Sequence, residues 1–592
     1  MSLLKIQYIL LFPLALLLIA AMACGDDEPT AAPTTAAPAT MAPEATMAPE
    51  ATMAPDATMA PEATAAPTAM AEPTATPEAM DDGLAERLTI AINNFDKDDL
   101  DPYRSGKTNL ASPDPFADFL IGITRDNQLT NVWGWADSWE QIDGKTWDLT
   151  LREDLKFHDG YGFADAADVA EIADLWTTDE AVGSQCLYCG TWVNLYDRAE
   201  ILDDHKIRIH LQSSYPLFFN ILPPIGGSDL FMFSVDALND GGGTALGYEN
   251  LSAPGTGPWD FVDRRLGQYF LYSRWDDYYS PDFRSNYKEM ELVLASEDAP
   301  RIALVQTGAA HMANSSGPFV EEIRAAGLEV DGAKMVDNVY GNFYQSYDEG
   351  HCTNKLNVRK ALNLAVDAEA IVDALWAPGT ATRISHPYTS PFVESWDPSL
   401  GLYGYDPDEA MRLLEQEGCA GFDIVVYGFA YAAGPEMLDM QDSICTYFNA
   451  VGVNCTFTPI DATAVRPLRQ EEKLGSADGP PHSGAHWIPS ARNFGEMLRS
   501  HGLCPSRGGS VCGMAQQDKY LALKDEYATE ADAVVRQELA KRVSRMVFEE
   551  YEGGIPIASR DWIWAIDPNK ICGWEPIDGT AARPMWNTVV PC

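Results

Sequence analysis

The chain has 592 residues and carries 88 acidic against 40 basic side chains, a formal net charge of −48 at pH 7. Such a field repels polyanions, so we predict no nucleic-acid partner and no binding to an anionic lipid surface. The 15 Trp, 24 Tyr and 22 Phe supply ample apolar mass, and because roughly 500 residues exceed what one core normally supports, we expect at least two lobes.

Residues 1–23 have the layout of an export signal. A single lysine precedes an apolar run from about Tyr8 to Ala21, which is too short to span a membrane. Small residues then lead to Cys24, the predicted first mature residue and the site of lipid attachment, with plain secretion as the alternative. We therefore expect an extracytoplasmic protein anchored to the cell membrane, in the periplasm or on the outer face.

Residues 24–86 read as a disordered tether. The hexamer Met-Ala-Pro-Glu/Asp-Ala-Thr repeats from Met41 to Thr64, and a proline every six residues blocks long helices. From Gly25 to about Gly83 the segment offers no large aromatic or branched aliphatic residue from which to build a core. It is predicted to be a spacer between the anchor and a folded module.

Cysteine usage agrees with export. Apart from Cys24 there are ten cysteines, and an even number in an exported chain favours disulfides. Cys504 and Cys512 bracket a Gly/Ser/Pro-rich loop, and Cys572 lies near Cys592, so these are the first predicted pairs. The pairing of four others stays open: Cys352, Cys419, Cys445 and Cys455.

The folded module opens with a predicted strand at Leu88–Ile92. Further on, apolar and polar residues alternate for most of the way from Trp147 to Phe157, which predicts two half-buried strand pieces. Asp159-Gly160 then breaks the chain into a turn.

A helix is predicted to start after that turn. Asp165, three residues before Asp168, has the pattern of an N-cap with an acid in the first turn. Val169, Ile172 and Leu175 are then expected on the inner face of the helix.

The second half of the chain alternates strand and helix patterns. Residues 422–459 read as a strand-helix-strand unit, which predicts parallel strands joined by a right-handed crossover. The other predicted elements are a strand at Lys206–Leu211, an apolar helix from Pro216, helices near 357–367 (with Val358, Leu362 and Ala365 on one face) and from 405–410, and a long helix at Val534–Phe548.

Several motifs resemble the family 5 extracytoplasmic solute-binding proteins, the peptide-, nickel- and oligopeptide-binding components of ABC importers. Lys156-Phe157-His158-Asp159-Gly160 with Asp168-Val169 matches the central signature of that family, although the turn at 161–163 is one residue longer than usual. Weaker matches are spread along the module: Leu100-Asp101-Pro102, Trp139, 254–259, 275–279, 301–312 and 357–367.

The resemblance implies a fold and a domain layout. The fold is α/β, a two-lobed periplasmic-binding-protein-like fold of the class II type, with mixed sheets and a ligand cleft between the lobes. The implied layout is a signal at 1–23, a tether at 24–86, lobe 1 at 87–340 with 556–592 returning to it, and lobe 2 at 341–555.

Family position also implies the ligand contacts. These are Lys107, Tyr340, Phe429, Tyr431, Trp487, Ser490 and Arg492. Peptide-binding members commonly place an Asp a few residues after the Trp, where it faces the α-amine of the peptide, whereas this chain has Ser490 there and Arg492 nearby. A hydroxyl and a guanidinium suit a carboxylate, a phosphate or sugar hydroxyls, so we predict that the ligand is not a short peptide held by its α-amine.

Catalytic and metal motifs are weak. His482 and His486 have helix-face spacing but lie in Gly/Pro/Ser-rich sequence with no zinc-protease glutamate. Cys186-x-x-Cys189 lacks the second ligand pair of a zinc site, and a structural disulfide is preferred to a redox or metal role. No Gly-x-Ser-x-Gly elbow occurs. We predict no metal and no cofactor.

The predicted function is therefore binding. A monomer captures a small ligand, whether peptide-like, sugar or organic acid, between its lobes and delivers it to the permease subunits of an ABC importer. The alternative is a secreted hydrolase acting on oligopeptides or oligosaccharides through a carboxylate pair, and an acidic chain offers too many acids to single out such a pair.

Overall fold

The computed structural model describes most of the chain beyond residue 82. The described residues are 83–95, 100, 114–178, 192–193, 195–215, 218, 222, 231–240, 254–344, 346, 349–386, 389–428, 436–460, 483–490, 516–530, 532–550, 555–579 and 583–592. The predicted signal and most of the tether, Cys24 included, lie outside them. Residues 79–592 form one unit.

A seven-stranded mixed sheet forms the centre of the first lobe. Its strand order is β10-β11-β12-β1-β13-β21-β14. Strand β1 runs parallel to both neighbours, and β21 pairs antiparallel with β13 and β14. The bounds are β1 Ala85–Ile92, β10 Trp259–Arg265, β11 Tyr269–Arg274, β12 Tyr287–Leu294, β13 Met312–Ser315, β14 Glu329–Asp331 and β21 Ile563–Ile566. The strand predicted at Leu88–Ile92 is confirmed, and its apolar residues are buried on both faces because β1 is central.

A six-stranded sheet forms the second lobe, in the order β16-β20-β15-β19-β17-β18. Its bounds are β15 Asp337–Tyr344, β16 Ala381–Arg383, β17 Asp423–Gly428, β18 Asn454–Pro459, β19 Ser483–Ser490 and β20 Ala558–Arg560. Strands β17 and β18 are parallel and are joined through helix α11, Met437–Ala450. The predicted strand-helix-strand unit with parallel strands is confirmed.

An antiparallel four-stranded sheet, β5-β6-β8-β7, extends the first lobe. Its bounds are β5 Ala136–Asp143, β6 Thr146–Leu151, β7 Tyr196–Asp203 and β8 Lys206–Leu211. Three two-stranded sheets complete the list: β2 Asp118–Phe119 with β9 Phe231–Met232, β3 Gly122–Ile123 with β4 Leu129–Thr130, and β22 Ile571–Gly573 with β23 Val590–Pro591.

The prediction of two strand pieces between Trp147 and Phe157 was wrong for the second piece. Only β6 forms, and the chain after Leu151 is a loop that folds back on itself. Ala164 N donates to Leu155 O (2.8 Å), and a single bridge joins Lys156 to Phe163. The alternation is real, but no strand among the described residues pairs with this loop.

The helix predicted after the turn is α1, Ala166–Leu175. The side chain of Asp165 accepts hydrogen bonds from Ala167 N and Asp168 N, and that of Asp168 accepts from Asp165 N, so the capping box is complete. Val169 and Ile172 are buried as expected, and Leu175 is half-buried.

The predicted helices of the second half are also present. Helix α8 buries Val358 and Leu362, with Ala365 buried just after its end. Helix α10 starts at Pro407 with Asp406 as its N-cap. The remaining bounds are α5 Val235–Asp240, α6 Asp298–Gln306, α7 Val320–Ala325, α8 Leu356–Leu364, α9 Ala368–Leu375, α10 Pro407–Gln416, α14 Gln517–Thr529 and α15 Ala533–Glu549.

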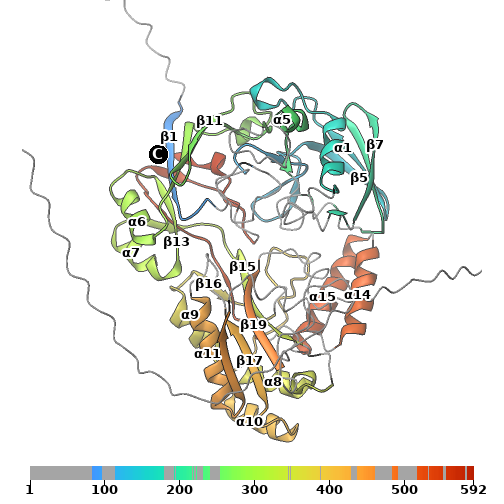
Figure 1. Ribbon diagram of the computed structural model, residues 1–592, viewed down its shortest axis with the longest axis vertical. Coiled ribbons are helices and arrows are strands. Elements are labelled where there is room, and N and C mark those ends of the chain that lie inside the picture. Colours follow the sequence, from blue (N-terminus) through green and yellow to red (C-terminus); the bar gives the residue numbers. More distant parts are fainter. Residues whose placement is uncertain are drawn as a thin grey trace, which may run out of the picture. The chain divides into compact units, whose positions relative to one another are not determined.

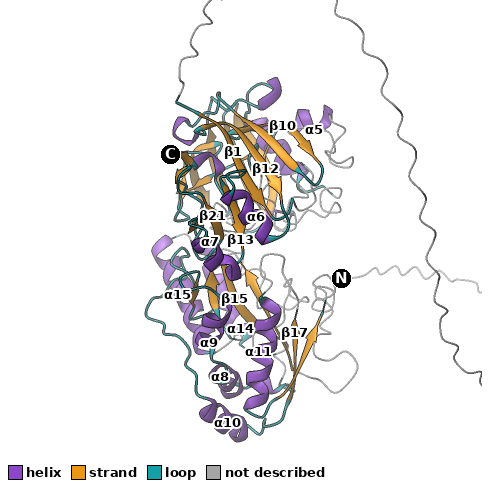
Figure 2. Cartoon of the chain, turned by 90° about the vertical axis from the view of Figure 1, so that its left-hand side faces the viewer, coloured by secondary structure: helices purple, strands orange, loops and turns teal. Residues whose placement is uncertain are grey.

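Two separate hydrophobic cores correspond to the two sheets. The larger one lies in the first lobe and also takes in residues of α14 and α15, and the second lies between the six-stranded sheet and helices α8 to α11. Figures 1 and 2 show the two sheets in different halves of the folded unit, with α8 to α11 around the lower sheet. The predicted two-lobed α/β fold with mixed sheets is confirmed.

Three disulfides lie among the described residues. Cys572–Cys592 confirms one predicted pair, and the four open cysteines pair as Cys352–Cys419 and Cys445–Cys455. The predictions for Cys504 with Cys512, and for Cys186 with Cys189, lie outside the described residues.

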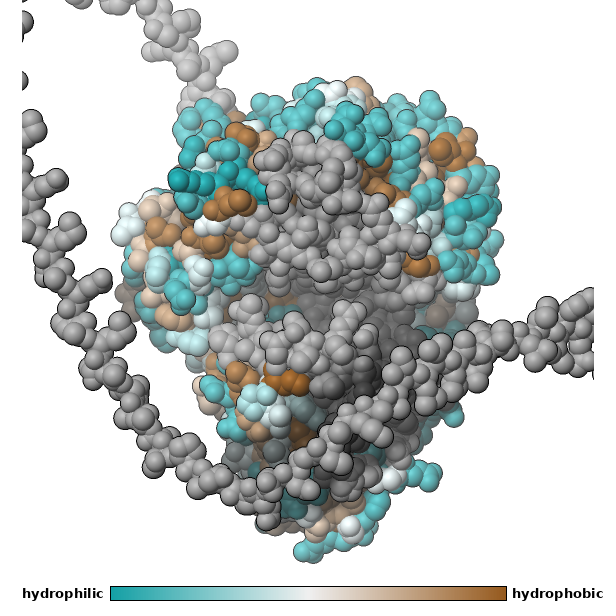
Figure 3. All heavy atoms as spheres, viewed as in Figure 1, coloured by the Kyte–Doolittle hydropathy of each residue, from teal (hydrophilic) through white to brown (hydrophobic). Residues whose placement is uncertain are grey.

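Among the described residues visible in Figure 3, polar residues predominate and hydrophobic residues form small separate spots. Within the described ranges no helix combines the length and the apolar character needed to cross a membrane. The same ranges contain no cluster of three His, Cys, Asp or Glu residues suited to a metal ion.

Candidate functional site

Three of the predicted ligand contacts lie on adjacent strands of the second sheet. Tyr340 on β15 is opposite Ile488 of β19, Trp487 is opposite Gly341, and Ser490 is opposite Asn338. The Tyr340 side chain is buried in the first-lobe core and lies near Tyr520 of α14. The other four, Lys107, Phe429, Tyr431 and Arg492, lie outside the described residues.

The chain passes between the two sheets at two neighbouring places. One crossing leads from β14 to β15, and the other leads from β20 to β21. Val336 N donates to Arg560 O (2.8 Å), and Trp562 N donates to Ala333 O (2.8 Å), so the two crossings are hydrogen-bonded side by side. Such a pair of short connections is where hinge bending between lobes concentrates.

Gly332 lies at a place where the two crossings approach each other closely. Its φ is +144°, and a Cβ at this position would lie 1.8 Å from Trp562 O. Only glycine therefore allows the crossings to lie this close.

A buried ion network ties the crossings to the second lobe. The Arg560 guanidinium donates to Glu436 Oε1 (2.8 Å) and to Asp337 Oδ2 (2.9 Å), and Trp376 Nε1 donates to the same Glu436 oxygen (3.0 Å). Burial alone lowers the pKa of Arg560, but the two carboxylates outweigh it and hold that pKa above its usual value. Arg560 thus stays charged and joins both crossings to the start of α11.

Glu436 matters because of its place in the chain. It immediately follows residues 429–435, the segment that carries the predicted contacts Phe429 and Tyr431. The ion network therefore fixes Glu436, the residue that follows that segment in the sequence, to the crossings.

The family signature around His158 is structural. His158 is buried, its Nε2 lies 2.9 Å from Gly257 O, and its N donates to Gly255 O (3.0 Å). Burial lowers the pKa of His158 to about 4, so the imidazole is neutral at physiological pH. Trp275 packs edge-on against the ring (4.9 Å between centroids). His158, at the centre of the family signature, thus has a structural role within the first lobe.

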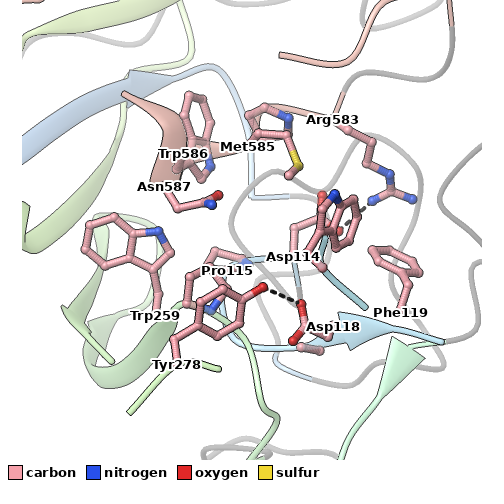
Figure 4. Close-up of a pocket in the computed structure, with 14 residues that line it drawn as sticks. Asp114, Pro115, Asp118, Phe119, Trp259, Tyr278, Arg583, Met585, Trp586 and Asn587 are labelled. Atoms are coloured by element: carbon pink, nitrogen blue, oxygen red, sulfur yellow. Dashed lines mark hydrogen bonds and ion pairs between the residues drawn. The ribbon is translucent and has the colours of Figure 1, made fainter. Parts of the chain in front are cut away.

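A separate pocket lies within the first lobe (Figure 4). It is lined by Asp114, Pro115, Ala117, Asp118, Phe119, Trp133, Pro258, Trp259, Tyr278, Arg583, Pro584, Met585, Trp586 and Asn587. Strand β2, the start of β10 and the C-terminal segment meet here, although the first and the last are more than 460 residues apart in the sequence.

Asp118 is the central polar residue of this pocket. Its carboxyl accepts hydrogen bonds from Tyr279 Oη (2.9 Å), Thr256 Oγ1 (3.1 Å) and Tyr278 Oη (3.2 Å). Burial nevertheless raises the pKa of Asp118 to about 7. The sequence interpretation missed this residue, although an acid inside the apolar run Phe116-Ala117-Asp118-Phe119-Leu120 is a usable signal.

The comparisons with known proteins agree with this geometry. The family model described as bacterial extracellular solute-binding proteins, family 5 Middle, matches residues 132–491. The glutathione-binding protein GsiB of Salmonella paratyphi A is 26% identical over 347 residues, 56% of this chain and 62% of GsiB. The aligned region is thus less than two thirds of the length of that relative.

Solved structures show the same fold. HbpA2 from Haemophilus parasuis aligns with a TM-score of 0.70 at 17% identity, covering 86% of this chain and 100% of HbpA2. NikA from Brucella suis, in complex with Fe(III)-EDTA, aligns with a TM-score of 0.67 at 20% identity, again covering 86% of this chain and 100% of NikA. Since the family model covers more than half of the sequence, the chain belongs to the family 5 bacterial extracellular solute-binding proteins.

Proposed function

We propose that this protein is the extracytoplasmic binding component of an ABC importer. It captures a small ligand between its two lobes and presents the closed form to the permease subunits. The observation that carries the proposal is the pair of adjacent crossings between the sheets, hydrogen-bonded to each other and fixed by Arg560. A hinge of this kind lets one lobe swing toward the other, and ligand binding then shifts the population toward the closed form.

The proposed ligand contacts are those predicted from the sequence. Tyr340, Trp487 and Ser490 belong to the adjacent strands β15 and β19, but Trp487 is one residue out of phase with the other two in the register, so all three rest on family position as well. Lys107, Phe429, Tyr431 and Arg492 rest on family position. The related proteins are described with different ligands, since GsiB is named a glutathione-binding protein and the NikA structure is a complex with Fe(III)-EDTA. The family by itself therefore leaves the ligand class open.

The ligand class follows from Ser490 and Arg492. Neither residue neutralises an ammonium group, and burying an unpaired charge in a closed site is costly. We therefore propose a carboxylate, a phosphate or a sugar rather than a peptide held by its α-amine. Tight binding of an unmodified dipeptide that is lost on N-acetylation would contradict this assignment.

The proposed arrangement on the cell follows from the N-terminal region. Cys24 carries the lipid after removal of residues 1–23, residues 24–86 form the tether, and the folded module acts as a monomer. Growth with labelled palmitate tests this: the wild type is labelled and membrane-bound, whereas the Cys24→Ala variant is unlabelled. An unlabelled wild type would favour secretion without an anchor.

The competing function is that of a secreted hydrolase. The protein is incubated with oligopeptides, oligosaccharides and organic acids, and both binding and product formation are followed by mass spectrometry. Saturable binding without new products supports the proposal, and turnover at enzymatic rates would overturn it. The Trp487→Ala and Arg492→Ala variants are expected to weaken binding at least tenfold, whereas Arg265→Ala, at an exposed position on β10, is the control that leaves binding unchanged.

A further inference from the structure

The pocket within the first lobe contains a buried donor without a partner. Trp259 is 1% exposed, and its Nε1–H has no hydrogen-bond acceptor among the residues that the structure describes. Figure 4 shows the indole nitrogen of Trp259 on the side of the ring that faces Asn587 and the pocket. Because buried donors are normally paired, this geometry indicates an occupant that accepts a hydrogen bond.

Asn587 offers the complementary group. One hydrogen of its Nδ2 donates to Phe283 O (2.7 Å), which leaves a second Nδ2 hydrogen and the acceptor Oδ1 as the groups that it can present to an occupant. An occupant between Trp259 and Asn587 must then accept from Trp259, and it can either donate to Asn587 or accept from it.

The charged groups of the pocket are already paired. Arg583 contacts Asp114 Oδ1 (2.5 Å), and Asp118 is held by three hydroxyl donors. Since burial also raises the pKa of Asp118 to about 7, it carries less than a full charge near neutral pH. The pocket therefore does not call for a charged occupant.

The size of the pocket and the residues that line it further limit which molecules can bind there. The cavity has a volume of about 40 Å³. Since one water molecule needs roughly 10–15 Å³ on the same measure, the pocket has room for about three water molecules. Trp133, Phe119 and Trp586 supply apolar ring surfaces. Such walls suit the C–H face of a small molecule, with a few polar groups fixing its orientation.

We propose that this pocket binds a small polyol, or the hydroxyl-bearing edge of a sugar, through Trp259 and Asn587. A hydroxyl group both accepts and donates, so it can accept from Trp259 and can pair with either group of Asn587. An alkylammonium ion has no acceptor for the Trp259 Nε1–H. A carboxylate would place a further acidic group in a pocket that Asp118 already lines. The site belongs to the first lobe alone, and it is independent of the ligand proposed to bind between the lobes.

The indole N–H resonances provide the test. The full chain is labelled with ¹⁵N-tryptophan, and the Trp259 signal is assigned by its loss in Trp259→Phe. Glycerol and erythritol are expected to shift this signal saturably, by more than they shift the other indole signals. Ethylammonium and acetate at equal concentration are expected to leave it in place. The variant Asn587→Leu is expected to keep the Trp259 signal and to weaken the glycerol response at least fivefold, which provides a readout even if Trp259→Phe does not fold.

Two results would overturn the proposal. If the Trp259 signal does not move with glycerol or erythritol up to molar concentration, the pocket holds water only. If ethylammonium or acetate shifts it as strongly as glycerol does, the polyol class is wrong. If the Asn587→Leu variant shows the same saturable shift of the Trp259 signal with glycerol, Asn587 does not take part in binding.

Discussion

The two lobes are stabilised in different ways. Within the described residues, the first-lobe core buries nine tryptophans, whereas the second-lobe core buries one, Trp376. The second lobe instead contains Cys352–Cys419 and Cys445–Cys455, whereas the described disulfide of the first lobe joins only the C-terminal segment to itself. A large aromatic core and a smaller cross-linked core are thus two solutions to the same problem of offsetting chain entropy.

The two crossings between the lobes are stabilised neither by an aromatic core nor by a disulfide. They are held by main-chain hydrogen bonds and by the buried contacts of Arg560. Rigid lobes on either side of a short polar connection are what a closing protein needs, since the motion is then confined to a few residues. The difference between the lobes therefore predicts where each perturbation acts.

The largest effect is expected from truncating the aromatic core. Trp564 is fully buried and contacts Trp562, Trp574 and Trp586 (4.9 to 5.5 Å between ring centroids). Replacing it by alanine should cost about 3–5 kcal/mol of stability, because a large cavity remains. Urea denaturation measures the loss, and hydrogen exchange should rise in β13, β14 and β21. The control Phe163→Ala removes a ring that is 63% exposed and should change stability little. Faster exchange confined to the second sheet would contradict the comparison.

The second effect concerns Asp118 and pH. Its pKa rises from 3.8 to about 7 on folding, so between these values the folded protein holds a proton that the unfolded chain has released. Stability from this group is therefore present at low pH and is lost as pH rises from about 4 to about 7, by on the order of 4 kcal/mol. The nearby Arg152 and the hydroxyls of Tyr278 and Tyr279 oppose the shift without reversing it.

The variant Asp118→Asn isolates the pH-dependent contribution of Asp118 to stability. The free energy of unfolding of the wild type minus that of the variant, measured from pH 4 to pH 8, should fall as pH rises. A difference that stays flat would mean that Asp118 is ionised throughout this pH range. A difference that rises with pH would mean that folding lowers the pKa of Asp118 instead of raising it.

The third effect is the loss of a cross-link in the second lobe. Replacing both Cys352 and Cys419 by serine frees a loop with a sequence separation of 67 residues. The expected loss of stability is about 2–4 kcal/mol. Hydrogen exchange should rise in α8 and α10, while the first sheet stays protected. Equal loosening of both lobes would show that the two cores are not separate units.

The smallest effect on stability is expected at the crossings. Lysine in place of Arg560 keeps the charge but has no planar fork with which to reach both Asp337 and Glu436. The expected cost is about 1–2 kcal/mol, accompanied by weaker ligand binding because the segment before Glu436 loses its anchor. Calorimetric titration and denaturation measure the two quantities, with Arg265→Lys as the exposed control. An unchanged affinity for the ligand would show that the ion network of Arg560 does not contribute to ligand binding.

Local patterns in the sequence were sufficient for several elements. The capping box of Asp165 and Asp168, the apolar face of α8 and the parallel β17–β18 unit depend on residues close together in the sequence. The strand predicted near Phe157 failed because alternation does not reveal whether a neighbouring strand exists. The family motifs predicted the two-lobed fold, although His158 itself turned out to be a buried structural residue.

Long-range partners could not be predicted in the same way. Arg560 and Glu436 are 124 positions apart, and Asp118 finds Thr256, Tyr278 and Tyr279 at separations of 138 to 161. Four unassigned cysteines allow three pairings, and only the fold selects one. Each of these features depends on how distant segments pack, which no local pattern specifies.

The central claim is that the two lobes close on a ligand that is not chemically changed. Spin labels are attached at Leu266, at the β10–β11 turn, and at Met411, on α10. These positions lie in different lobes, and their side chains are 67% and 38% exposed. The distance between them is measured by double electron–electron resonance, without and with the compound that binds in the panel. We predict a shorter, narrower distance distribution that saturates with one bound molecule, which is recovered intact. An unchanged distribution at saturation, or recovery of a converted product, would contradict the account.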